Sequence, residues 1–124
     1  MRQQKFGAAF VIAAVIAIGS LVTVSADNPE QVKQLRETRE CRGCNLAFSS
    51  LDGVNVELGD LREADLQGAS LYGANLRGAD LTGALFTDTN LNNTDLRNTK
   101  GANLAGAQTN EQTKCPDGSS GPCK

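Results

Sequence analysis

Large apolar side chains recur at every fifth position through the middle of the chain, beginning at residue 46. On an α-helix this spacing scatters side chains around the whole circumference, and on a flat strand it alternates them between the two faces. Neither element can bury the set on one side, so the pattern predicts an all-β solenoid that turns a corner after every five residues and points these side chains inward. The repeated positions are Leu46, Leu51, Val56, Leu61, Leu66, Leu71, Leu76, Leu81, Phe86, Leu91 and Leu96.

The other positions of the repeat fit the same path. The residue two places before each large side chain is small or β-branched, which suits a second inward position near a crowded axis. The residue between them is mostly Asn, Asp or Ser and is expected to point outward into solvent. Two residues after most large side chains comes Gly, Asp or Asn, the types that tolerate the left-handed conformation of a corner.

Runs such as ADLQG at residues 64–68, ANLRG at 74–78 and ADLTG at 79–83 resemble the pentapeptide-repeat family, and the resemblance covers residues 44–98. It implies the family's right-handed quadrilateral β-helix with four pentapeptides per coil, and therefore about three coils. Side chains twenty residues apart should then stack in columns. In the same register Glu57 should face Arg77 as an exposed ion pair.

The N-terminal segment, residues 1–26, is predicted to be a signal peptide. Arg2 and Lys5 precede an uncharged stretch from Phe6 to Val24, and the small residues at 24–26 favour cleavage after Ala26. An uncleaved membrane anchor is the alternative, because the uncharged stretch is nearly long enough to span a bilayer. Contact with a membrane is expected through this segment only.

Residues 27–43 are predicted to form a capping α-helix, over about residues 29–40, and a linker. The first coil carries Phe48 and Leu58 at corners where later coils mostly have Gly, Asp or Asn. We expect Phe48, Val54 and Leu58 to lie near the lid formed by this helix. The alternative is that Phe48 and Leu58 form an exposed patch for a partner.

The repeat domain is expected to span residues 44–106 and to be followed by a polar tail at 107–124. The register should break at the three inserted residues Thr99–Gly101, before one further pentapeptide at 102–106. In the tail a Pro-Asp-Gly turn is expected to bring Cys115 and Cys123 together.

Four cysteines in an exported chain favour disulfides, and four allow three pairings. A disulfide needs Cα atoms within about 7 Å, so the local bonds Cys41–Cys44 and Cys115–Cys123 are the simplest, although a long fold-back of the tail would permit others. The C-x-x-C spacing of Cys41 and Cys44 also raises a redox role. A helix C-terminus opposes the thiolate, which favours a structural bond over redox chemistry. A zinc site made of all four cysteines fits poorly, because 70 residues separate the two pairs.

Composition narrows the remaining functions. The formal net charge is −2, and the chain contains neither His nor Trp. The absence of histidine excludes imidazole chemistry and histidine metal sites. No cofactor, metal, catalytic residue or nucleic-acid partner is expected. Asp60 and Asp80 are expected to share a face with Arg62 nearby, but outward carboxylates are what this repeat produces in any case.

The layout resembles that of small exported pentapeptide-repeat proteins, and this implies the thylakoid lumen or the periplasm. The predicted function is a non-enzymatic scaffold or interaction module for an unknown protein partner, in an oligomeric state that stays open. Leu85 and Tyr72 break the outward polar pattern and are the candidate contact residues, although both could be ordinary surface side chains. The alternatives are a thiol–disulfide protein that uses Cys41 and Cys44 and, less favoured, a DNA-mimicking topoisomerase inhibitor.

Overall fold

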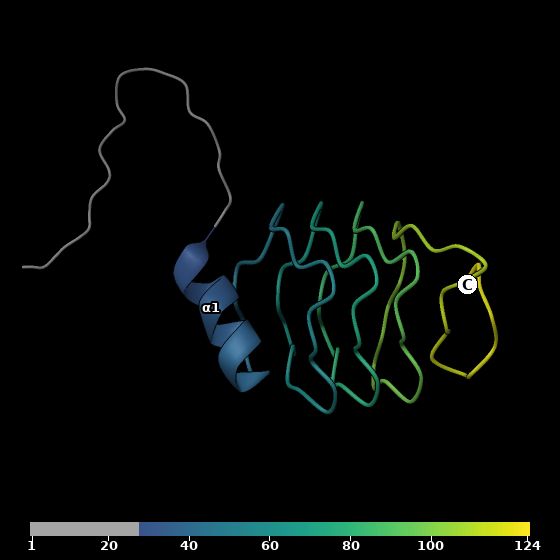
Figure 1. Ribbon diagram of the computed structural model, residues 1–124, viewed down its shortest axis with the longest axis horizontal. Coiled ribbons are helices and arrows are strands. Elements are labelled where there is room, and N and C mark those ends of the chain that lie inside the picture. The colour runs from purple at the N-terminus through teal and green to yellow at the C-terminus, as the bar shows by residue number, and fades with distance from the viewer. Residues whose placement is uncertain (1–27) are drawn as a thin grey trace, which may run out of the picture.

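The computed structural model describes residues 28–124, so the predicted signal peptide, 1–26, lies outside the described residues. Helix α1, Pro29–Thr38, precedes a stack of coils that ends with the C-terminal tail (Figure 1). The coils have four sides. The solenoid predicted from the period of five is therefore present.

Backbone bridges twenty residues apart define the four sides. Each side is a ladder of outward residues joined by parallel bridges, and twenty residues correspond to four pentapeptides. Within residues 28–124 the bridges are isolated and no extended strand forms, because a turn begins two residues after most ladder residues. The ladders are Glu40–Asp60–Asp80–Lys100, Asn45–Asp65–Leu85, Ser50–Ser70–Asn90–Gln108 and Asn55–Asn75–Asp95–Lys114.

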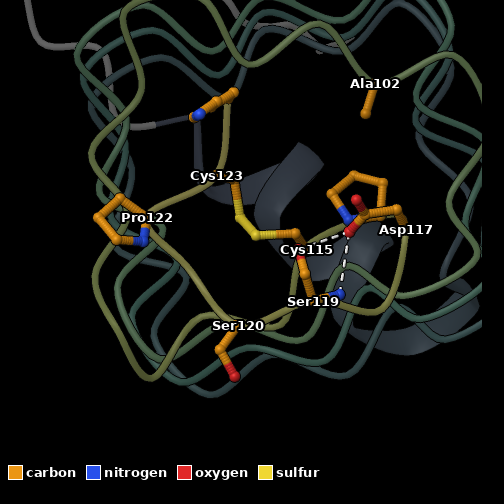
Figure 2. A pocket seen from close by; sticks show the side chains of 9 residues that line it. Ala102, Cys115, Asp117, Ser119, Ser120, Pro122 and Cys123 are labelled. Atoms are coloured by element: carbon orange, nitrogen blue, oxygen red, sulfur yellow. Dashed lines mark hydrogen bonds between the residues drawn. A yellow bond between two sulfur atoms is a disulfide. The ribbon is translucent and has the colours of Figure 1, made fainter.

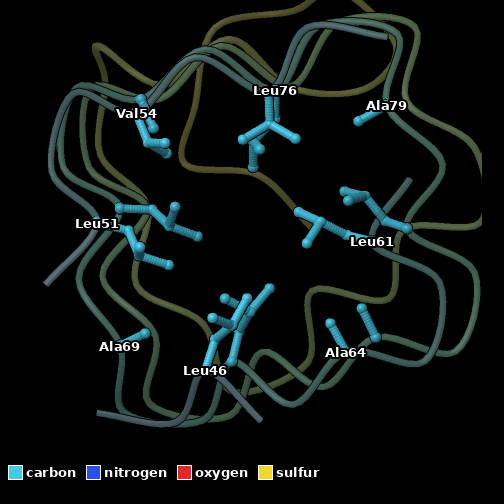
Figure 3. Packing of buried hydrophobic residues seen from close by; sticks show 14 of the residues in the cluster. Leu46, Leu51, Val54, Leu61, Ala64, Ala69, Leu76 and Ala79 are labelled. Carbon is cyan, nitrogen blue, oxygen red and sulfur yellow. The ribbon is translucent and has the colours of Figure 1, made fainter. Parts of the chain in front are cut away.

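The core consists of the periodic side chains that the sequence pattern singles out. All eleven, from Leu46 to Leu96, are buried, and none is more than 1% exposed. In Figure 3 the leucines converge on the axis, while Ala64, Ala69 and Ala79 line the wall. The inward assignment of both positions is confirmed. Burial of this kind contributes about 1.5–3 kcal/mol for each large aliphatic side chain.

Buried threonines tie successive coils together where later pentapeptides replace the small inward alanine. Each hydroxyl donates a hydrogen bond to a carbonyl oxygen of the preceding coil. Ser49, twenty residues before Ala69 in the same column, is also buried, yet its hydroxyl has no hydrogen-bond partner among the described residues. The bonds run from Thr89 Oγ1 to Leu66 O at 2.6 Å, from Thr94 Oγ1 to Leu71 O at 2.7 Å and from Thr113 Oγ1 to Leu91 O at 2.9 Å.

Helix α1 begins at Pro29, as predicted, and ends at Thr38 rather than near residue 40. It stops there because Arg39 adopts a left-handed conformation with φ 62°, from which its N–H bonds back to Leu35 O. Leu35 is fully buried in the core cluster, and Val32 packs against that cluster.

Side chains of α1 also bind backbone groups of the first coil. The carbonyl oxygen of the Gln31 side chain accepts a hydrogen bond from Asn45 N at 2.6 Å, and Arg36 Nη2 donates one to Ser50 O at 3.1 Å. In later coils the backbone of the preceding coil pairs with the equivalent groups, as Cys44 O does with Asp65 N and Leu51 N does with Ser70 O. The helix therefore satisfies polar groups that the first coil leaves free.

The register changes later than the sequence indicates. The bridge between Asp80 and Lys100 keeps the twenty-residue spacing, so the expectation of a break at Thr99–Gly101 is wrong. Lys100 simply takes the next outward position. The spacing first shortens to eighteen residues at Asn90–Gln108, and residues 102–106 pass Leu85 without forming a bridge.

Candidate functional site

The outward Asn and Asp residues hold the corners of the solenoid. In each case the side-chain Oδ1 accepts a hydrogen bond from the backbone N–H two residues later, at 2.9–3.2 Å. This Asx-type bond gives these residues a structural role, whereas sequence reasoning treated them only as solvated positions. The residues are Asn45, Asn55, Asp60, Asp65, Asn75, Asp80, Asn90 and Asp95.

Asp60 and Asp80 are adjacent on one ladder, as expected, with Arg62 beside them. Arg62 Nη2 lies 2.6 Å from Asp60 Oδ2, and Arg62 Nε lies 3.9 Å from Asp80 Oδ2. The hydrogen bond from the Arg62 side chain lowers the pKa of Asp60 to about 2. The pKa of Asp80 is also lowered, chiefly by the hydrogen bond from the Thr82 side chain. Both carboxylates are thus ionised at neutral pH and share no proton, so the pair does not have the form of an acid–base site.

The expected ion pair between Glu57 and Arg77 does not form. Glu57 Oε1 instead accepts a hydrogen bond from Asn75 Nδ2 at 3.0 Å. Asn75 lies directly in the ladder next to Asn55, so its amide reaches the carboxylate first. The same amide group accepts the backbone N–H of Arg77, which fixes the corner without an ion pair.

The two candidate contact residues are exposed and lie on different faces. Leu85 is 49% exposed and is the last residue of its ladder, next to Asp65. Tyr72 is 48% exposed and lies at the corner after Ser70, with its N–H bonded to Asp52 Oδ1 at 3.1 Å. The ladder of Ser50, Ser70 and Asn90 separates the two side chains. They therefore do not form one continuous patch.

Phe48 and Leu58 do not lie under the helix: their side chains are 68% and 76% exposed. The expected contact with a lid is therefore wrong for both. Val54 is the one residue of the three that is buried. Phe48 and Leu58 both have φ 60°, and this left-handed corner directs the side chains outward. The Phe48 ring lies over Gly68 of the next coil, where a Cβ would overlap it. They occupy opposite corners, so they do not form a single patch either.

The structure joins Cys41 to Cys44 and Cys115 to Cys123, with Cα–Cα distances of 5.3 and 5.5 Å. Each bond lies at one end of the leucine core. Cys41 is fully buried, and it precedes Leu61 by twenty residues. Its N–H donates to Asp60 O just as Leu61 N donates to Asp80 O, so Cys41 begins the column of Leu61. Cys115 follows a ladder residue, Lys114, and therefore continues the column of Leu96. Sequence reasoning missed these two column positions, although counting in twenties from Leu61 would have found the first.

A cavity of about 500 Å³ opens at the C-terminal end of the solenoid. Figure 2 shows the Cys115–Cys123 bond in its centre, surrounded by Ala102, Ser120 and Pro122. Asp117 and Lys124 also line the cavity. The Ser119 side chain donates a hydrogen bond to Asp117, which lowers the pKa of that carboxyl.

Between residues 28 and 124, no three His, Cys, Asp or Glu side chains are grouped so that they could hold a metal ion. In the same range, no helix has both the length and the apolar character needed to cross a membrane.

The repeats and the twenty-residue ladders define a pentapeptide-repeat solenoid. The family model for pentapeptide repeats matches with eight copies, over residues 40–78, 64–100 and 77–108. The chain belongs to the pentapeptide-repeat family, whose fold is a right-handed quadrilateral β-helix. Proteins of this family are generally structural or interaction proteins without enzymatic activity.

Comparison with curated proteins gave no match. Among solved structures, the pentapeptide repeat protein Rfr23 from the cyanobacterium Cyanothece 51142 is 23% identical, covering 68% of this chain and 96% of that one, with a TM-score of 0.32. A pentapeptide repeat protein from the Arabidopsis thaliana thylakoid lumen is 26% identical, with coverages of 65% and 71% and a TM-score of 0.33. QnrB1, a plasmid-mediated fluoroquinolone resistance protein, is 26% identical, with coverages of 59% and 38% and a TM-score of 0.36. At these TM-scores the likenesses carry no argument about function.

Proposed function

We propose that the protein is an exported, non-enzymatic interaction module that presents its solenoid faces to a protein partner. The observation that carries the proposal is Leu85. It occupies an outward ladder position where eight other pentapeptides have Asn or Asp with a corner-forming hydrogen bond. A leucine gives up that bond and exposes an apolar side chain. Local rules are broken in this way most often where function requires it.

Export is supported by the N-terminal sequence pattern and by the two disulfides. An uncharged stretch with small residues at 24–26 favours transport and cleavage after Ala26. Disulfides persist in oxidising compartments and are rare in the cytosol. The proposed location is the thylakoid lumen or the periplasm.

We infer that α1 serves as the N-terminal cap of about three coils. Leu35 covers the core, while Gln31 and Arg36 bind backbone groups of the first coil. An uncovered terminal coil would offer its free backbone groups to another chain. The cap therefore keeps partners away from the N-terminal end of the solenoid.

The charge pattern offers less support for a DNA-mimicking role. The carboxylates of Asp60 and Asp80 are bridged by Arg62, and Arg97 Nη2 lies 2.6 Å from Asp95 Oδ2. A phosphate-like row needs unneutralised negative charges at regular spacing. On these faces the guanidinium groups of Arg62 and Arg97 lie against the carboxylates instead.

The test compares Leu85→Asn with Leu58→Gly in affinity capture from the compartment in which the native protein is found. Leu85→Asn removes the apolar surface, adds no charge and restores an acceptor for the corner N–H, so the fold is preserved. Leu58→Gly removes a leucine that is more exposed than Leu85, 76% against 49%, at a distant corner, and it relieves a left-handed conformation. We expect the partner captured by the wild type to be lost with Leu85→Asn and retained with Leu58→Gly.

Equal recovery of the same partner by the wild type and by Leu85→Asn would remove Leu85 from the interface. Tyr72→Ser then tests the second exposed position in the same way. Loss of the partner with every variant, Leu58→Gly included, would mean that contact is not localised on the Leu85 face.

A further inference from the structure

The two disulfides differ in how they meet solvent. Cys41 and Cys44 are both buried, and Cys41 Sγ lies 3.5 Å from Gln31 O of helix α1. The core lies on one side of this bond and the helix on the other. An incoming thiolate must approach a sulfur along the S–S axis, and packed side chains and backbone occupy that space here.

The second disulfide forms part of the wall of an open cavity. Cys115 is buried at the end of the leucine core, whereas Cys123 is half-buried. Both line the hollow of about 500 Å³ at the C-terminal end (Figure 2). This volume exceeds by far that of a single water, which occupies about 30 Å³ of the liquid. The sulfur of Cys123 is therefore accessible to a thiol without prior unfolding of the solenoid.

The tail that carries Cys123 is held by a small number of bonds besides the disulfide. Cys123 N donates to Thr109 Oγ1 at 2.9 Å, and Gly121 N donates to Thr113 O at 2.8 Å. Lys114 and Ser120 form one antiparallel bridge. Cys115 N also donates to Ser119 O at 2.8 Å, and Asn98 N donates to Pro116 O at 3.1 Å. Breaking the S–S bond leaves the tail attached by hydrogen bonds of this kind, while the ladders of the leucine core stay in place.

We propose that Cys115–Cys123 is a site of thiol–disulfide exchange with a dithiol protein of the thioredoxin class, and that Cys41–Cys44 is a structural bond. This moves the redox hypothesis from the C-x-x-C pair to the pair at the other end of the molecule. It is independent of the proposed contact at Leu85.

The exchange proceeds in two balanced steps. A thiolate of the dithiol protein attacks Cys123 Sγ, the S–S bond breaks, and the Cys115 sulfur leaves as a thiolate that takes a proton from water. The second thiol of the dithiol protein, once deprotonated, attacks that protein's own sulfur in the mixed disulfide, and the Cys123 sulfur leaves as a thiolate. Two electrons pass to the cysteine pair, and the dithiol protein is left as a disulfide.

The experiment follows both bonds in one sample of the oxidised full chain. The protein is incubated with a purified thioredoxin-class protein and its reductant, quenched with an alkylating agent at successive times and digested with trypsin. Cleavage at Arg and Lys separates the two pairs, because residues 115–124 carry one pair and residues 40–42 and 43–62 carry the other. We expect Cys115 and Cys123 to be alkylated at least about tenfold faster than Cys41 and Cys44.

Two controls separate attack on the native protein from unfolding. Low concentrations of urea should leave the rate at Cys115–Cys123 unchanged if attack occurs through the cavity, since no unfolding is required. Ala102→Phe, which places a large side chain in the cavity, should slow that rate when circular dichroism shows the fold intact. A thioredoxin-class variant without its resolving cysteine should be trapped as a mixed disulfide on Cys123.

Three results would overturn the proposal. One is reduction of both pairs at the same rate, with that rate following the unfolding rate as urea is added. Another is trapping of the mixed disulfide on Cys41 or Cys44. The third is a rate at Cys115–Cys123 that a correctly folded Ala102→Phe variant does not change.

Discussion

The column that contains Ser49, Ala69 and Thr89 offers a direct test of how the coils are held together. Thr89 is fully buried, and its hydroxyl donates to Leu66 O at 2.6 Å across two successive coils. Ser49 occupies the same position forty residues earlier, where no coil precedes it, and its hydroxyl has no partner within residues 28–124. Thr89→Val and Ser49→Ala thus remove a satisfied and an unsatisfied buried hydroxyl from one column.

The expected magnitude follows from what each substitution leaves behind. Thr89→Val keeps the volume and loses one hydrogen bond, a net contribution of about 0.5–1.5 kcal/mol. Leu66 O still accepts the N–H of Ala69 at 3.0 Å, so the substitution leaves no buried carbonyl unpaired. The larger cost of an unsatisfied buried group therefore does not apply. We therefore expect Thr89→Val to lower the free energy of unfolding by about 1 kcal/mol. Ser49→Ala should leave it unchanged or raise it slightly.

The assay is reversible urea unfolding of the oxidised protein, followed by far-UV circular dichroism, with thermal unfolding as a second measurement. For a domain of about 100 residues, 1 kcal/mol corresponds to about 4–8 °C in Tm. The slope of the urea transition should be the same in all three proteins, because none of the changes alters the surface exposed on unfolding. Wild-type stability in Thr89→Val would refute the reasoning. An equal loss in Ser49→Ala would refute it as well.

Three further predictions concern the corners, the helix and the charges. Leu85→Asn should raise the free energy of unfolding by about 0.5–1 kcal/mol, and with it the urea midpoint, because the new side chain accepts the backbone N–H two residues later. Gly59→Ala should cost about 1–3 kcal/mol, because its Cβ would overlap Arg39 O beneath the helix. The Asp60 pKa is lowered from 3.8 to about 2 by Arg62, so its stabilising contribution is present above pH 3.8 and is lost as the pH falls towards 2. Urea midpoints between pH 5 and 2 should show a shallower decline in Asp60→Asn than in the wild type.

Each of these predictions has a contrary outcome. A lower midpoint for Leu85→Asn would show that the leucine itself stabilises the fold. Wild-type stability in Gly59→Ala would mean that the helix does not lie against that glycine. Parallel pH profiles for the wild type and Asp60→Asn would show that the bond to Arg62 contributes nothing to acid stability.

The core was predictable because one period sets both the corners and the burial. From Leu46 to Leu96 every fifth residue faces the axis, and no tertiary contact outside the repeat competes with that pattern. The sequence predicted that the outward Asn and Asp side chains face solvent, but it did not predict their role in the corners. That Asn and Asp accept the corner N–H depends on the tight turn, which hydropathy does not report.

The ends of the solenoid were harder to predict, because no repeat specifies them. Phe48 fits a buried lid by composition, yet its left-handed φ of 60° turns the ring outward over Gly68. The register holds through Lys100 although the motif is lost there, because backbone bridging tolerates any side chain at an outward position. The cavity beside Cys115 depends on how the tail folds back, and the pattern of residues 107–124 does not encode this.

The central claim, an exported solenoid closed by a disulfide at each end, is tested most directly by intact-mass measurement of the native protein from fractionated cells. The sample is treated with an alkylating agent, with and without prior reduction. The account predicts a lumenal or periplasmic species that begins at Asp27, takes up no label before reduction and takes up four labels after it, one for each cysteine. A full-length species with Cys41 and Cys44 labelled before reduction would contradict it.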